Sequence, residues 1–168
     1  MKEESLRKRI RDGNIRRQDV VRRMAELAFG KANDCVRLVL DADALWAVSE
    51  NVSILQETKA PVVITPHVGE FRRLGGDKTG DRLADALSFA AEYGCVTVLK
   101  GHRTVVAFPE GDAYILATGN PGMARGGSGD VLTGLLGGLL AASKAQPPAA
   151  EAMAAFTAAV ACEIHGLA

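Results

Sequence analysis

One carboxylate stands inside a glycine-dense segment, at Asp130 in the run 120–134, NPGMARGGSGDVLTG. An apolar run that predicts a helix follows it directly. Asp130 and Ser128 are both common N-cap residues, and a carboxylate is stabilised by the positive end of a helix dipole. Capping does not explain the neighbouring glycines, which cost backbone entropy on folding. Consecutive backbone N–H groups at a helix start bind phosphate, and a carboxylate there can accept a hydroxyl proton or hold a water or metal ion. We therefore favour an anion site over a capped turn.

Three other polar clusters each follow a predicted strand. They are Asp41 and Asp43; Thr65, His67 and Glu70; and Lys100, His102, Arg103 and Thr104. Each has a simpler interpretation, because Asp41 can cap a turn, His67 can be a surface loop histidine, and the turn KGHRT can be merely solvent-exposed. Lys100 with the amides of that turn can also bind phosphate.

The order of apolar segments predicts how these clusters are positioned. Short runs rich in branched residues predict strands at 36–40, 62–65 and 95–100, with helices at 44–50 and 81–93 between them. We expect Asp43 to cap the first helix and Gly94 to stop the second. Strand–helix–strand order predicts a parallel sheet, and ligands bind beyond the carboxyl ends of such strands. The three clusters and the glycine-rich loop should therefore meet at one edge.

The rest of the chain supplies a hairpin and flanking helices. The runs TVVAF and AYIL flank a PEGD turn, and helices are predicted at about 130–142 and 149–166. Residues 1–34 form a separate basic segment with seven arginines and a helical apolar stripe; residues 35–168 form one domain. We read the basic segment as a packed, solvated helix, because no aromatic residues interleave with its arginines as they do in nucleic-acid-binding segments.

Composition bounds the function class. The formal net charge is zero and the apolar content is 48%, as in ordinary globular proteins. Three widely spaced cysteines indicate reduced thiols, and no run is apolar and long enough to cross a membrane. We expect a cytoplasmic protein with no nucleic-acid or membrane partner.

Four segments, in order, resemble the ADP/ATP-dependent NAD(P)H-hydrate dehydratases, a branch of the ribokinase-like superfamily with a carbohydrate-kinase-like domain. They are LVLDADAL (38–45), ITPHVGEFRRL (64–74), VLKGHRTVVAFPEG (98–111) and GNPGMARGGSGDVLTG (119–134). The resemblance covers about residues 36–168. It implies a ribokinase-like α/β fold, a parallel sheet in α/β/α layers with a β-hairpin.

The resemblance also implies a reaction. Hydrated NADH or NADPH, written NAD(P)HX, is phosphorylated from ADP or ATP with Mg²⁺, and loss of phosphate restores the dihydronicotinamide. Asp130 is then the catalytic base, and the hydrated substrate meets Asp130, His67 and Asp41. The expected nucleotide-binding residues are Lys100, Gly101, His102, Arg103, Thr104, Asn120, Gly126, Gly127, Ser128 and Gly129.

The sequence also departs from the family pattern. Only 35 residues precede Val36, they do not resemble the family's longer N-terminal part, and Arg125 stands where threonine is usual. We expect the N-terminal part of the usual domain to be missing, and the exposed sheet edge to be covered in a homo-oligomer. Two alternatives stay open: a small-molecule kinase acting on a vitamin-precursor alcohol, and a non-catalytic nucleotide-binding protein.

Overall fold

Branched apolar runs form a five-stranded mixed sheet. The computed structural model describes residues 37–143 and 149–168, so the basic segment 1–34 and Pro147-Pro148 lie outside the described residues. The strands are β1 (Leu38–Leu40), β2 (Val62–Ile64), β3 (Val96–Leu99), β4 (Val105–Ala107) and β5 (Ala113–Ile115). The first three are parallel and the last two form the expected antiparallel hairpin. The predicted parallel strands and the hairpin are confirmed.

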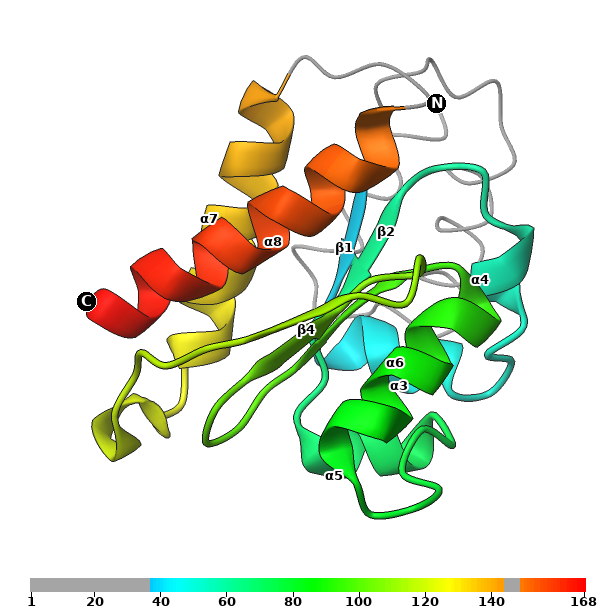
Figure 1. Ribbon diagram of the computed structural model, residues 1–168, viewed down its shortest axis with the longest axis horizontal. Helices are drawn as coiled ribbons and strands as arrows, with labels where there is room; N and C mark the ends of the chain where they lie inside the picture. Colours follow the sequence, from blue (N-terminus) through cyan, green and yellow to red (C-terminus); the bar gives the residue numbers. More distant parts are fainter. Residues whose placement is uncertain (1–36, 144–148) are drawn as a thin grey trace, which may run out of the picture.

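Helices cover both faces of this sheet (Figure 1). They are α3 (Asp43–Val48), α4 (Ile54–Glu57), α5 (Val68–Arg73), α6 (Arg82–Tyr93), the 3₁₀ turn η1 (Pro121–Met123), α7 (Ser128–Ala142) and α8 (Ala149–Leu167). Phe71 and Phe89 pack with the inward side chains of β1 and β2 on one face. Leu132 and Leu136 of α7 join Val63 on the other face, together with alanines of α8. This is the predicted α/β/α layering.

Local capping explains where the helices begin and end, with two corrections. Asp81 accepts hydrogen bonds from the amides of Leu83 and Ala84 at the start of α6, and Gly94 ends it with φ +62°. Asp43 is not the cap of α3, because Ala42 occupies that position with φ +42° and Asp43 already lies in the first turn. The start of α7 differs in the same way, as described below.

Candidate functional site

An ion pair joins the carboxyl ends of β1 and β3. Lys100 Nζ donates to Asp41 Oδ1 at 2.7 Å, and the two side chains are only 23% and 10% exposed. Thr133 of α7 donates to the other carboxylate oxygen at 3.1 Å. Both oxygens of Asp41 are therefore occupied, and one carboxylate fastens three elements together.

The charge of Asp41 depends on this pairing. Burial alone raises the pKa of a carboxyl group, but the Lys100 ion pair, with hydrogen bonds from Thr65 and Thr133, more than offsets that effect. The pKa of Asp41 is consequently below its ordinary value. The carboxylate stays ionised and holds the Lys100 ammonium in place.

Gly129 packs closely against this pair at the start of α7. A Cβ on Gly129 would lie 3.3 Å from Asp41 Oδ2 and 3.4 Å from Lys100 Nζ, tighter than most side chains tolerate. Gly127 is the N-cap of α7, with φ +90°, and it provides no side-chain cap. The alternative reading, in which Ser128 or Asp130 is the N-cap of α7, is therefore wrong. Asp130 lies in the first turn of α7, is exposed, and makes no capping hydrogen bond.

His67 caps α5 and lies next to the same edge. Its Nδ1 accepts from the amides of Gly69 (2.9 Å) and Glu70 (3.1 Å), while Glu70 Oε2 accepts from the amide of His67 at 2.7 Å. An accepting Nδ1 places the ring proton of a neutral histidine on Nε2. That atom lies 3.3 Å from Glu70 Oε1, on a side chain that is 60% exposed. His67 also forms an isolated parallel bridge with Lys100, so the second and third clusters are neighbours.

The turn 100–104 presents exposed backbone. Gly101, His102 and Arg103 are exposed, and Arg103 has φ +54°, an uncommon value for a residue other than glycine. Thr104 donates its hydroxyl to the Gly101 carbonyl at 3.1 Å, and the Lys100 amide donates to the Pro66 carbonyl at 2.8 Å. The turn is thus tied both internally and to the preceding strand end.

Side chains near the C-terminal end of α8 contact the residues that flank the glycine-rich loop. Glu163 accepts from the hydroxyls of Thr118 and Tyr114, both at 2.7 Å, which holds its pKa below the ordinary value. Ser128 Oγ lies 3.3 Å from His165 Nε2. This contact joins the start of α7 to the C-terminal part of α8.

Asn120 fixes the other end of the loop. Its side-chain oxygen accepts from the amide of Gly122 at 2.8 Å and so begins the 3₁₀ turn. Gly126 and Gly127 are exposed farther along the loop. Backbone amides are therefore accessible beside Asp130.

The structure brings together most of the predicted site residues. Asp41, His67, Lys100 and Gly129 meet at one edge, whereas Asp43 is exposed on α3 and no contact joins it to them. Sequence reasoning missed Thr133, whose only signal was a hydroxyl in an otherwise apolar helix. It also missed the arginine that opens α6, discussed below.

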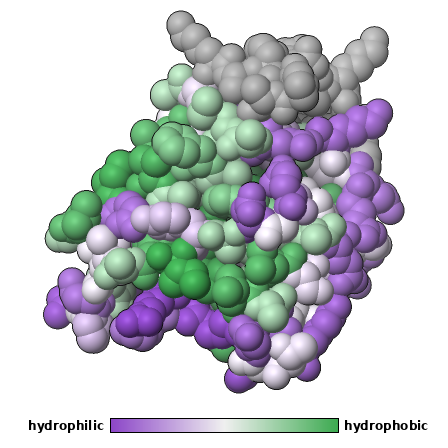
Figure 2. Space-filling view, in the orientation of Figure 1, coloured by the Kyte–Doolittle hydropathy of each residue, from purple (hydrophilic) through white to green (hydrophobic). Residues whose placement is uncertain are grey.

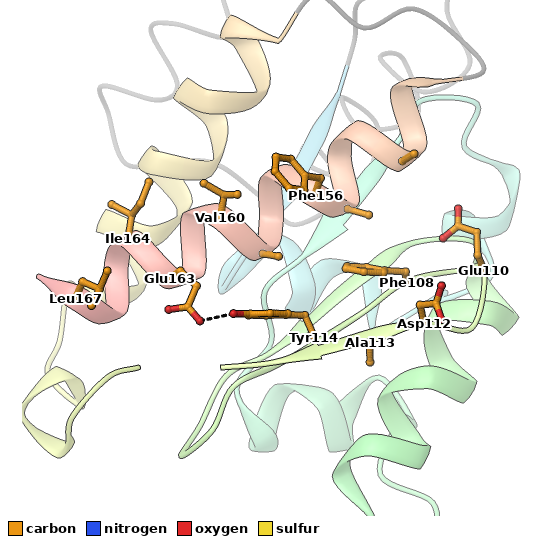
Figure 3. Close-up of a pocket in the computed structure, with 13 residues that line it drawn as sticks. Phe108, Glu110, Asp112, Ala113, Tyr114, Phe156, Val160, Glu163, Ile164 and Leu167 are labelled. Carbon is orange, nitrogen blue, oxygen red and sulfur yellow. Dashed lines mark hydrogen bonds between the residues drawn. The ribbon is translucent and has the colours of Figure 1, made fainter. Parts of the chain in front are cut away.

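A separate cavity of about 660 Å³ lies between α8 and the β4–β5 hairpin (Figure 3). Phe108, Tyr114, Phe156, Ile164 and Leu167 are among the side chains that line it. None of the predicted substrate or nucleotide residues does. Figure 2 shows apolar side chains gathered over α8 and the adjoining hairpin. This surface is apolar and exposed, and it is distinct from the polar edge.

Residues 37–143 and 149–168 lack two kinds of feature. No cluster of three or more His, Cys, Asp or Glu side chains is arranged to hold a metal ion. No helix within those ranges has the length and apolar content needed to span a membrane.

Comparison with known proteins gives a consistent family. A family model described as NAD(P)H-hydrate dehydratase matches residues 18–168. The bifunctional NAD(P)H-hydrate repair enzyme of Moorella thermoacetica is 47% identical over 125 residues, covering 72% of this chain and 23% of that protein. The corresponding enzyme of Gloeobacter violaceus is 46% identical, covering 79% of this chain and 25% of that protein. The chain thus spans about a quarter of these relatives.

Solved structures agree with the fold. The ADP/ATP-dependent NAD(P)H-hydrate dehydratase of Bacillus subtilis, co-crystallised with ATP and Mg²⁺, superposes with a TM-score of 0.64 at 33% identity, covering 79% of this chain and 45% of that one. A ribokinase-like superfamily protein of Enterococcus faecalis gives a TM-score of 0.69 at 30% identity, covering 90% of this chain and 48% of that one. The expected ribokinase-like fold is confirmed.

Proposed function

This chain belongs to the NAD(P)H-hydrate dehydratase family, and we propose that it takes part in nucleotide-dependent dehydration of hydrated NADH or NADPH. The products are NAD(P)H, phosphate, and AMP or ADP according to the donor. The activity is that of a lyase acting in metabolite repair.

One observation carries the proposal. The Asp41–Lys100 pair lies directly under Gly129, and the next residue, Asp130, is an exposed carboxylate in the first turn of α7. The Asp130 carboxylate thereby lies beside the amides at the start of α7, which favour a phosphate group. Phosphorylation of a hydroxyl needs both a proton acceptor and an anion site in one place.

Each residue has a step of its own in this proposal. Asp130 accepts the proton of the misplaced hydroxyl. His67 orients the hydrated nicotinamide through Nε2 of its exposed imidazole, because Nδ1 already accepts the capping hydrogen bonds of α5. The turn 100–104 and the loop before Gly129 hold the adenine nucleotide. Asp41 holds the Lys100 ammonium in position through their ion pair.

The donor set fits Mg²⁺ and a nucleotide. Mg²⁺ is bound through one or two carboxylates, phosphate oxygens and retained waters, not by a dedicated protein cage. Phosphate oxygens of the nucleotide and retained waters would supply most of the ligands, because Asp130 is the proposed proton acceptor and both oxygens of Asp41 already accept hydrogen bonds from Lys100 and Thr133. When bound, the ion neutralises charge on the transferring phosphoryl group.

We extend the proposal to assembly and location. The exposed edge strand β5 and the apolar face of α8 favour a homo-oligomer, since such surfaces are usually covered. Burial raises the pKa of the Cys95 and Cys162 thiols to about 12. Inert, reduced thiols are compatible with a cytoplasmic location.

The direct test is a repair assay on the chain with Mg²⁺, supplied with either ADP or ATP and with either hydrated NADH or hydrated NADPH. Return of dihydronicotinamide absorbance, dependent on nucleotide, supports the proposal and identifies the donor. A stable phosphorylated alcohol without absorbance recovery would indicate the kinase alternative. Nucleotide binding by calorimetry with no turnover would indicate the non-catalytic alternative.

A further inference from the structure

Arg82 opens α6, and its guanidinium lies against the turn 100–104. Nη1 donates to the carbonyl of His102 at 2.7 Å, and Nη2 donates to the carbonyl of Leu99 at 3.0 Å. The Leu99 carbonyl precedes the turn, and the His102 carbonyl lies in its exposed middle. A single planar fork therefore holds both its entry and its middle, which a lysine ammonium does not reproduce.

These bonds determine which way the turn's amides face. In a planar trans peptide the carbonyl and the following N–H point in opposite directions. Because the His102 carbonyl is directed at Arg82, the Arg103 amide is directed away from it. The same relation holds for the Leu99 carbonyl and the Lys100 amide, which donates to Pro66.

The backbone conformation indicates that contacts with neighbouring residues hold the turn in its shape. Arg103 has φ +54°, which persists only where surrounding contacts over-determine the conformation. Gly101 lies at the point of contact: a Cβ there would lie 2.8 Å from Arg82 Nη2, so the guanidinium would have to move away from the turn. Arg82 Nε is buried and has no hydrogen-bond partner among the described residues. The Nε–H donor of the guanidinium is thus unsatisfied, which costs desolvation free energy. The two charge-assisted hydrogen bonds to the turn offset this cost.

We propose that Arg82 is a positioning residue, which holds the turn 100–104 in the shape that binds the phosphate end of a nucleoside di- or triphosphate. This inference rests on the proposed function, which makes the turn a nucleotide contact. Arg82 acts through the Leu99 and His102 carbonyls and not by touching the nucleotide.

The experiment compares Arg82→Lys and Arg82→Gln with Arg72→Lys, a change at an exposed arginine of α5 whose partner, Asp77, lies in the following loop. Backbone order parameters of residues 101–104 are measured without ligand, together with those of α6. Affinity for ADP with Mg²⁺ is then measured by calorimetry. We expect order parameters of the turn to fall from about 0.85 toward about 0.6 in both Arg82 variants, with α6 unchanged. Affinity should fall about tenfold or more, and the Arg72 variant should match the wild type.

The two readouts separate the two ideas. A wild-type turn that is already flexible, a turn unchanged in the Arg82 variants, or loosening of α6 equal to that of the turn would each overturn the positioning role. Unchanged ADP affinity despite a loosened turn would overturn its link to nucleotide binding. If the wild type binds no nucleotide, the proposed function and the nucleotide link both fail, and the order parameters alone decide whether Arg82 holds the turn.

Discussion

Replacing Asp130 with asparagine separates chemistry from stability. Asp130 lies in the first turn of α7, three residues after the Gly127 cap, and its side chain caps nothing. The only stabilisation lost is the attraction between one exposed charge and the helix dipole, about 0.3–1 kcal/mol. For a chain of this length, that lowers the melting temperature by at most about 4 °C.

The expected effect on the reaction is much larger. Asparagine cannot accept the hydroxyl proton, and positioned general bases contribute ~10²–10⁴-fold to rate. Repair should fall by that factor, while ADP affinity stays equal or tightens slightly because a negative charge beside the phosphate site is removed. The measurements are melting temperature, ADP affinity by calorimetry, and repair rate, all on the same protein.

Glu151→Gln is the matched control. Glu151 is an exposed carboxylate in the first turn of α8, so its substitution removes the same dipole interaction away from the polar edge. It should show the small stability loss and full repair. Full repair by folded Asp130→Asn would refute the general-base role and leave Asp130 as a charge at a helix start.

The remaining predictions concern packing, pH and assembly. Gly129→Val should weaken ADP binding at least about tenfold by crowding the Asp41–Lys100 pair, whereas Gly134→Val, whose Cβ meets no atom within 4 Å, should leave calorimetric affinity unchanged; equal effects would contradict the close-packing argument. The lowered pKa of Asp41 means that its ionised form stabilises the fold above the ordinary value of 3.8 and that this contribution is lost as pH falls through the lower folded value. The advantage of wild type over Asp41→Asn in urea midpoint should therefore be constant above about pH 5 and shrink below about pH 4, and a pH-independent difference would count against it. The chain should self-associate at micromolar concentration through the α8 face, where Phe156 is 66% exposed, and Phe156→Ser should shift light scattering toward monomer; a monomeric wild type would remove the idea.

Periodicity and turn chemistry were enough to predict the architecture. Branched runs such as VVI and VTVL predicted buried strands, and the PEGD turn predicted the hairpin. These signals are local, because strand formation and turn geometry depend on neighbouring residues. Ligands bind at the carboxyl ends of parallel strands, and this rule predicted that Asp41, His67 and Lys100 lie at one edge of the sheet.

The tertiary structure decided what each of those side chains does. Sequence patterns cannot show that the two carboxylate oxygens of Asp41 accept hydrogen bonds from Lys100 and Thr133, since these partners lie 59 and 92 positions away along the chain. They also left Asp130 open as a possible N-cap, whereas in the structure Gly127 occupies that position.

The role of Arg82 likewise depends on the tertiary structure and not on the local sequence. At the start of an amphipathic helix it reads as an ordinary exposed arginine, and its carbonyl partners come from 17 and 20 residues later. Local propensity determines which elements form. The roles of polar side chains at the sheet edge come from pairings between distant segments, which exist only after the sheet has brought those segments together.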